Sequence, residues 1–196
     1  MKGRVGKVVR KTTETEIEVE WGLDGTGDHE ISTGLPFFDH MLSQLAKHGA
    51  FDVKLAAKGD LAVDAHHTVE DVGICLGQAL KEALGDKMGI RRFGQALSPM
   101  MDALAQVALD VGGRPHLVYR LTSSTTRVGV FDVQLIEEFF KAFCSQGGVD
   151  LHVEVPYGEN VHHMVEAVFK GLGRALREAV CPDERRKGVP STKGML

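Results

Sequence analysis

The stretch DAHHTVEDVGICLGQALKEAL, residues 64–84, returns ninety-six residues later as NVHHMVEAVFKGLGRALREAV, residues 160–180. An ungapped comparison of residues 66–84 with 162–180 gives eleven identical pairs among nineteen. In both copies apolar residues recur at three- and four-residue spacings, which is typical of an amphipathic helix. A doublet of histidines followed by a glutamate therefore opens two equivalent helices, and the repeat predicts a duplicated fold.

The duplication continues upstream of these helices with small shifts of register. FDVKLAA from Phe51 aligns with VDLHVEV from Val149, and FFDHMLSQLAKHG aligns with LIEEFFKAFCSQG, which places Glu138 opposite His40. Alternating apolar residues predict strands, and helical spacings predict helices. The expected strands are residues 5–10, 15–21, 51–57, 104–111, 116–121 and 149–155, and the expected helices are residues 36–49, 66–84, 132–145 and 161–180.

Each half thus reads as a β-β-α-β-α unit. Residues 1–86 form the first half-repeat, and residues 87–196 form the second together with a C-terminal tail. No low-complexity linker separates them, so one compact catalytic unit is expected. Such a succession of elements predicts an α+β fold in which helices cover one face of the sheets.

Composition limits the classes of function. The chain has 196 residues, of which 43% are apolar, enough for one well-formed core. A net charge of −4 gives no basic surface for nucleic acid. No segment approaches the roughly 18 apolar residues of a membrane span. Three cysteines at no metal-ligand spacing favour a reducing, cytoplasmic location.

The histidine doublets have the geometry of metal ligands. At 100° per residue, His66 and Glu70 lie on one helix face and can chelate one ion. His67 points to another direction and should reach a different ion. Mixed imidazole and carboxylate ligands suit manganese, iron, nickel or zinc. The alternative, a solvated polar helix start, explains a lone motif better than it explains two copies at matching positions.

If a pseudo-two-fold axis relates the halves, two metal sites follow. One would combine His66, Glu70 and His163. The other would combine His162, Glu166 and His67. His40 and its counterpart Glu138 would add one further ligand to each site.

Five separated motifs, HHTVED, FFDHML, GRPHLVY, HHMVEA and PSTKG, resemble the imidazoleglycerol-phosphate dehydratase family over essentially the whole chain. The resemblance implies two pseudo-symmetric half-domains of the ribosomal protein S5 domain 2-like kind, two Mn²⁺ per subunit, and a homo-oligomer of 24 subunits with active sites between subunits. The implied metal ligands are His40, His66, His67, Glu70, His162, His163 and Glu166. Glu138 departs from the pattern, because EEFF stands where the family has EHFF; a carboxylate can still bind the same class of metal.

The resemblance also implies a reaction of histidine biosynthesis, in which D-erythro-imidazole glycerol phosphate loses water to give imidazole acetol phosphate. No carbonyl acidifies the carbon-bound proton, but a deprotonated imidazole ring can expel the hydroxyl. Two cations at the ring nitrogens would favour that anion. Glu14 is expected to transfer protons, with Glu166 close by. Without the resemblance, Glu14 reads as a solvated strand-edge residue.

Cationic and hydroxyl groups are expected to bind the substrate phosphate. The residues that match the family's substrate contacts are Glu14, His48, Arg92, Arg114, Ser191, Thr192 and Lys193. Asp102 is expected to be a structural polar residue outside the site. A di-metal phosphatase or hydrolase is the alternative function, although its usual aspartate-rich ligand clusters are missing. A nucleic-acid-binding module is disfavoured by the charge.

Overall fold

The computed structural model describes residues 3–194 and contains two successive sets of elements. The first set is β1 (Val5–Lys11), β2 (Thr15–Gly22), β3 (His29–Ser32), α1 (Pro36–Gly49), β4 (Asp52–Gly59) and α2 (His66–Leu84). The second set is β5 (Phe93–Met100), β6 (Ala103–Asp110), β7 (His116–Arg120), β8 (Arg127–Val128), β9 (Phe131–Asp132), α3 (Leu135–Gly147), β10 (Asp150–Tyr157) and α4 (Val161–Val180). No helix among residues 3–194 combines the length and the apolar character that a membrane crossing requires.

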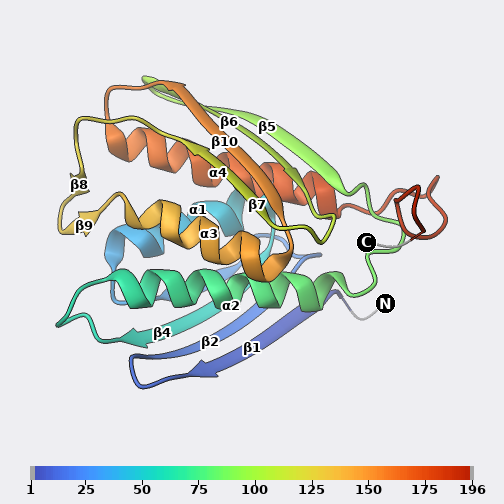
Figure 1. The fold of residues 1–196 in the computed structure, drawn as a ribbon, viewed down its shortest axis with the longest axis horizontal. Coiled ribbons are helices and arrows are strands. Elements are labelled where there is room, and N and C mark those ends of the chain that lie inside the picture. Colours follow the sequence, from blue (N-terminus) through green and yellow to red (C-terminus); the bar gives the residue numbers. More distant parts are fainter. Residues whose placement is uncertain (1–2, 195–196) are drawn as a thin grey trace.

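Each set forms one four-stranded sheet, and the two sheets share one topology. The strand orders are β1-β2-β4-β3 and β5-β6-β10-β7, in which the last pair is parallel and the others are antiparallel. Helix α2 packs on the first sheet and α4 on the second, while α1 contacts α4 and α3 contacts α2. All four helices therefore lie between the two sheets, whose other faces stay open (Figure 1). The expected α+β class with helices on one face of each sheet is confirmed.

Each half contains a strand that the β-β-α-β-α pattern did not predict, β3 in the first half and β5 in the second, and the second half also contains the unpredicted β8 and β9. Strand β3 was missed because it is a four-residue edge strand with mostly exposed side chains. Strand β5 was missed because its buried positions are Gly94, Ala96 and Ser98, and because Pro99 interrupts the apolar pattern. Each half is thus β-β-β-α-β-α, with the short β8-β9 hairpin added to the second.

Close contact between strand and helix recurs at equivalent positions of the two halves. Gly6 in β1 lies against the carbonyl oxygen of Ala79 in α2, and Gly94 in β5 lies against the carbonyl oxygen of Ala175 in α4. A Cβ atom at either glycine would overlap that oxygen. The duplication therefore reaches the backbone packing that fixes each long helix on its sheet, and with it the position of each histidine doublet.

Candidate active site

The two histidine doublets occupy the first turns of α2 and α4. The backbone N–H of His66 donates to Oδ1 of Asp64 at 2.8 Å, and the backbone N–H of His162 donates to Oδ1 of Asn160 at 2.9 Å. Short polar side chains just before a helix satisfy N–H groups that have no partner within the helix. These equivalent contacts fix where each helix starts and thereby which way its histidines face.

Three candidate ligand atoms converge at the start of α4. Nε2 of His40, in α1, lies 3.4 Å from Oε2 of Glu166, and Nε2 of His162 lies 3.2 Å from the same oxygen. All three atoms lie within 4.8 Å of one another, so the group could hold a metal ion. Two imidazole nitrogens and one carboxylate oxygen are a donor set suited to divalent transition metals.

Lys170 is a neighbour of this cluster that the sequence analysis did not single out. Its Nζ lies 2.6 Å from Oε1 of Glu166, one helical turn away. Burial raises the pKa of Glu166, but the hydrogen bonds and charges of Lys170 and His40 outweigh burial and lower it. Glu166 is therefore ionised at neutral pH, as a ligand must be. The i,i+4 spacing from Glu166 could have indicated Lys170 in advance.

The equivalent residues of the first half are more open. Nε2 of His66 lies 3.8 Å from Oε2 of Glu70, and these side chains are 43% and 46% exposed, compared with 8% for Glu166. Glu138 is turned toward Lys141, with 2.9 Å between Oε1 and Nζ. Within residues 3–194 of one chain, the sets that the sequence analysis combined across the two doublets do not come together as a three-ligand group.

The second histidine of each doublet contacts an aspartate. Nδ1 of His67 lies 3.0 Å from Oδ2 of Asp60, and Nδ1 of His163 lies 2.5 Å from Oδ1 of Asp102. The hydrogen bond with Asp60 raises the pKa of His67. Asp102 was expected to lie outside the site, but it contacts the candidate ligand His163, because the β5–β6 turn carries its carboxylate to the start of α4.

Glu14 and Asp102 occupy equivalent hairpin turns, each immediately before the second strand of its half. Oε1 of Glu14 lies 3.9 Å from Nε2 of His67. Oδ2 of Asp102 instead accepts the backbone N–H groups of Glu159 at 2.6 Å and Asn160 at 2.9 Å. The Asn160 N–H, the His163 ring and the Glu159 N–H together hold the pKa of Asp102 well below its usual range. An alignment of the two halves that included these turns would have placed Asp102 opposite Glu14 and so marked it as a candidate site residue.

A separate pocket of about 250 Å³ gathers the expected phosphate-binding residues. Nε and one terminal nitrogen of Arg92 donate to the two oxygens of Asp110 at 2.7 and 2.8 Å, and the other terminal nitrogen donates to the Pro190 carbonyl at 2.8 Å. Arg92 therefore ties the C-terminal tail to the strand. The pocket is lined by Arg92, Gly112, Gly113, Arg114, Ser191, Thr192 and Lys193. His48 lies elsewhere, in the last turn of α1, where burial followed by the charges of Lys170 and Arg174 lowers its pKa.

The pocket and the ligand cluster lie at opposite ends of α4. His162 is in the first turn, whereas the backbone N–H of Arg92 bonds the carbonyl of Ala179 near the last turn. Seventeen residues of helix span about 25 Å. Figure 1 shows the start of α4 at the left and the C-terminal tail at the right. Within one chain, a small substrate cannot touch both.

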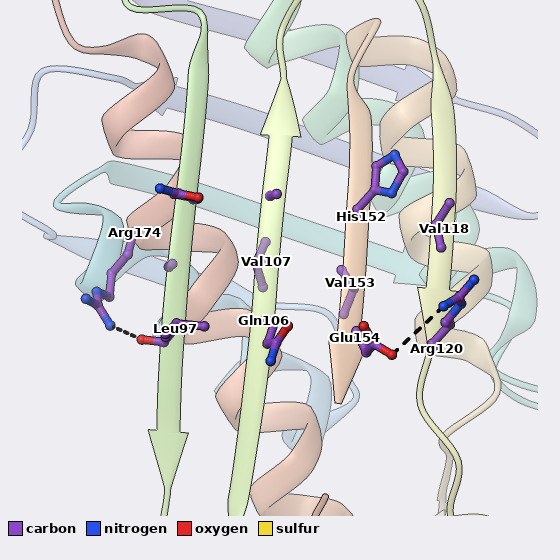
Figure 2. Close-up of a pocket in the computed structure, with 12 residues that line it drawn as sticks. Leu97, Gln106, Val107, Val118, Arg120, His152, Val153, Glu154 and Arg174 are labelled. Atoms are coloured by element: carbon purple, nitrogen blue, oxygen red, sulfur yellow. Dashed lines mark hydrogen bonds and ion pairs between the residues drawn. The ribbon is translucent and has the colours of Figure 1, made fainter. Parts of the chain in front are cut away.

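A larger concavity of about 700 Å³ covers the open face of the second sheet. Figure 2 shows its lining, in which Arg174 donates to the carbonyl of Leu97 at 2.8 Å and Arg120 faces Glu154 at 3.9 Å. None of the predicted site residues lines it. The residues singled out from the sequence lie instead mainly at the helix starts and around the smaller pocket.

The fold is a duplicated α+β fold that carries an imidazole–carboxylate cluster and a separate cationic pocket. These features are typical of an enzyme that binds a small anionic molecule. The chain matches the imidazoleglycerol-phosphate dehydratase family over residues 33–176. It is 57% identical over 98% of both chains to the imidazoleglycerol-phosphate dehydratase of Syntrophobacter fumaroxidans, and 56% identical to that of Geobacillus thermodenitrificans over 98% of this chain and 99% of that one.

Solved structures agree with these relatives. The enzyme from Staphylococcus aureus subsp. aureus N315 superimposes with a TM-score of 0.83 at 34% identity, over 91% of this chain and 99% of that one. The Pyrococcus furiosus enzyme, in complex with (S)-C348, gives 0.81 at 39% identity, over 96% and 100%. The chain belongs to the imidazoleglycerol-phosphate dehydratase family and is a hydro-lyase of histidine biosynthesis.

Proposed function

We propose that the chain converts D-erythro-imidazole glycerol phosphate to imidazole acetol phosphate with two divalent metal ions, Mn²⁺ or a similar transition metal, for each subunit. The observation that carries the metal dependence is the convergence of His40, His162 and Glu166. Their donor atoms fit such an ion in type and in spacing. When bound, the ions supply positive charge at the substrate ring nitrogens, which favours the deprotonated imidazole.

The remaining ligands are assigned from the doublets. His66 and Glu70 form the chelating pair of the second site, and Glu138 is its further candidate. His67 and His163 complete the two sites, with ligands drawn from more than one chain. The exposed first-half pair is consistent with a site that closes only on assembly.

Glu14 is the proposed proton carrier. It lies beside Nε2 of His67, the ring nitrogen available for an ion. Its turn is held in place because the backbone N–H groups of Glu14 and Thr15 donate to Oγ of Thr12 at 3.1 and 2.9 Å. Glu14 would take the carbon-bound proton and assist departure of the hydroxyl. Glu166 is a second carboxylate close to the substrate, although Lys170 and two imidazoles already occupy it.

The separation of the ligand cluster from the phosphate pocket supports an active site built between subunits. One chain would bind the imidazole end and another chain the phosphate, in a homo-oligomer for which we propose 24 subunits. Within each subunit we place the boundary of the half-repeats at residues 86 and 87, in the segment between α2 and β5.

We further propose a cytoplasmic location. Cys75, Cys144 and Cys181 are all free, and burial raises the pKa of both Cys75 and Cys144 to about 12. Unpaired cysteines suit a reducing compartment.

Metal analysis coupled to a product assay tests the function. Chelation should abolish formation of imidazole acetol phosphate, and Mn²⁺ should restore it. Light scattering should show smaller species after chelation and recovery of the large particle with Mn²⁺, because an ion shared between chains favours association. An unchanged particle after verified metal removal would contradict shared ligation. Release of inorganic phosphate in place of the ketone would instead support a phosphatase.

Removal of one ligand should have the largest effect of any substitution. His163→Ala should reduce metal content and lower turnover about 1,000-fold or more, because Lewis-acid stabilisation is worth several kcal/mol. The matched control is His152→Ala on β10, outside the site, which should retain activity. Full occupancy and near-normal turnover in His163→Ala would refute the ligand assignment.

A further inference from the structure

We propose that Asp60 and Asp102 are positioning residues that hold His67 and His163 in the tautomer and ring orientation that metal binding requires. The inference rests on the metal-dependent function proposed above. Each carboxylate approaches Nδ1 of its histidine, at 3.0 Å for Asp60 and 2.5 Å for Asp102. A carboxylate accepts hydrogen bonds and does not donate them, so each Nδ1 carries the proton. Nε2 then keeps its lone pair for an ion on the other side of the ring.

The two histidines of each doublet are oriented by different means. His66 and His162 each present Nε2 to the glutamate four residues on, at 3.8 and 3.2 Å. His67 and His163 have no such partner on their own helix. The neighbouring rings are 6.1 Å apart in both doublets, with interplanar angles of 90° and 76°. Adjacent residues lie about 100° apart around the helix axis, so the two rings of each doublet face different directions, and the second ring needs an anchor from outside the helix.

The two anchors come from segments that are not equivalent in the repeat. Asp60 belongs to the six-residue segment 60–65 that joins β4 to α2. The corresponding segment before α4 has only three residues, 158–160, and carries no aspartate. In that half Asp102 reaches His163 from the β5–β6 turn and bonds the N–H groups of the short segment as well. The same contact is thus made in two different ways, which indicates that the contact itself is required.

Asp60 is poorly explained by stability alone. Its Oδ1 is buried and has no hydrogen-bond partner among residues 3–194. Leaving a buried polar atom without a partner is unfavourable, so such an atom needs an explanation, and a functional role is one. Orientation of a metal ligand supplies such a role, because changing a hydrogen-bond partner of this kind typically costs about 10- to 100-fold in metal affinity.

Asp60→Asn and Asp102→Asn test the inference, since each keeps the side-chain size and removes the charge. Mn²⁺ affinity would be measured on the purified full assembly by competition with a chelating dye. The Tm would be measured with and without Mn²⁺. We expect the Kd for Mn²⁺ to rise about 10- to 100-fold in each variant. The metal-free Tm should stay unchanged in Asp60→Asn and should fall slightly in Asp102→Asn, because Oδ2 of Asp102 also accepts the N–H groups of Glu159 and Asn160. The rise in Tm caused by Mn²⁺ should shrink in both variants.

Asp150→Asn is the matched control. Asp150 contacts His152 at 3.2 Å at the open face of the second sheet, outside both doublets, so this variant should bind Mn²⁺ as the wild type does. In a His163→Ala background, Asp102→Asn should not weaken Mn²⁺ binding further, because its effect passes through the missing ring.

Three outcomes would overturn the inference. Wild-type Mn²⁺ affinity in both aspartate variants would refute it while leaving the metal-dependent function intact. A lower metal-free Tm with full Mn²⁺ affinity would assign the aspartates to folding. A wild-type enzyme that binds no divalent ion would overturn the proposed metal dependence and this inference with it.

Discussion

Residues 24–28 and 112–116 form equivalent loops in the two halves, and residues 112–114 of the second loop line a pocket of about 250 Å³. Each loop lies beside an arginine, Arg4 or Arg92, at the start of the first strand of its half. Both guanidinium groups donate to a carboxylate through two nitrogens and to a carbonyl oxygen through the third. The partners are Asp24 and Val180 for Arg4, and Asp110 and Pro190 for Arg92.

The difference lies in what fills the loop. In the first half, Oδ1 of Asp52 accepts the N–H groups of Thr26, Gly27 and Asp28 at 2.8, 3.2 and 3.1 Å. The equivalent Asp150 faces His152 instead. Arg114 stands where the first half has Thr26. In the second loop Pro115 has no N–H group, and the N–H groups of Gly113 and His116 donate to the carbonyls of Gly148 and Val149 at 2.9 and 3.1 Å. The backbone of the first loop thus binds the chain's own carboxylate, whereas the second loop contributes the Arg114 side chain to a pocket that Arg92 and Lys193 also line.

Among the substitutions that test this difference between the loops, Arg114→Ala should lower kcat/KM most, because it removes the cation that the first loop lacks. Loss of a desolvated ion pair with phosphate is worth about 2–4 kcal/mol, or roughly 30- to 1,000-fold in kcat/KM. KM should rise strongly, kcat should fall less, and metal content should not change. Arg120→Ala, an exposed arginine paired with Glu154, is the matched control.

A substrate analogue without phosphate separates recognition from folding. The wild type and Arg114→Ala should process it about equally poorly. An equal loss on the analogue and on the true substrate would show that Arg114 supports the fold and does not bind the phosphate.

Alteration of the tail should give a smaller loss. Lys193→Ala removes a second cation from the pocket and should raise KM about tenfold, since lysine binds phosphate as a point charge. Deletion of residues 190–196 should exceed this, because it also removes Ser191, Thr192 and the carbonyl that Arg92 bonds. Lys187→Ala is the control, because this exposed lysine of the same C-terminal segment does not line the pocket. If the deletion has no effect on KM, the tail does not close the pocket over the substrate.

Asp52→Asn should have the smallest effect, and on stability only. Three N–H groups lose an anionic acceptor in an exposed loop, so the free energy of unfolding should fall by about 1 kcal/mol at pH 7. The hydrogen bond from the Thr26 N–H contributes most to lowering the pKa of Asp52. Burial acts in the opposite direction, and the N–H groups of Asp28 and Gly27 lower the pKa further. Because the pKa of Asp52 is lower in the folded state than in the unfolded state, its carboxylate stabilises the fold at pH values above the unfolded-state pKa, about 3.9. This stabilisation is lost as the pH falls through the pKa of the folded state.

Urea unfolding of the metal-free proteins at fixed concentration measures this difference. The difference in the free energy of unfolding between the wild type and Asp52→Asn should be largest at pH 7 and should become smaller as the pH is lowered. KM should be unchanged, because the first loop binds no substrate. A gap that is the same at pH 7 and about pH 3 would exclude the carboxylate as its cause.

Periodic local features were the ones that the sequence predicted well. The long helices α2 and α4 match their expected bounds, because repeated apolar spacing and the flanking residues define them together. The pairing of each doublet's first histidine with its glutamate followed from helix geometry alone. Strand β3 was missed because an exposed four-residue edge carries no apolar alternation.

Contacts between distant segments could not be read in the same way. Asp60 and Asp102 reach equivalent histidines through a loop and a turn of different lengths, and loop geometry is not encoded in periodicity. The Arg92–Asp110 pair joins neighbouring strands, so it depends on strand β5, which was not expected. The length of α4, by contrast, was available from its residue count. It could have shown that ligands and phosphate pocket lie far apart.

That length has a genetic consequence. If the two ends of α4 belong to different active sites, each chain contributes its histidines to one substrate and its arginines to another. A variant that lacks the histidines and a variant that lacks the arginines then lose different parts of the active sites. Co-assembled, they would restore a fraction of sites in which both contributing ends are intact, so two inactive alleles would complement each other within one particle.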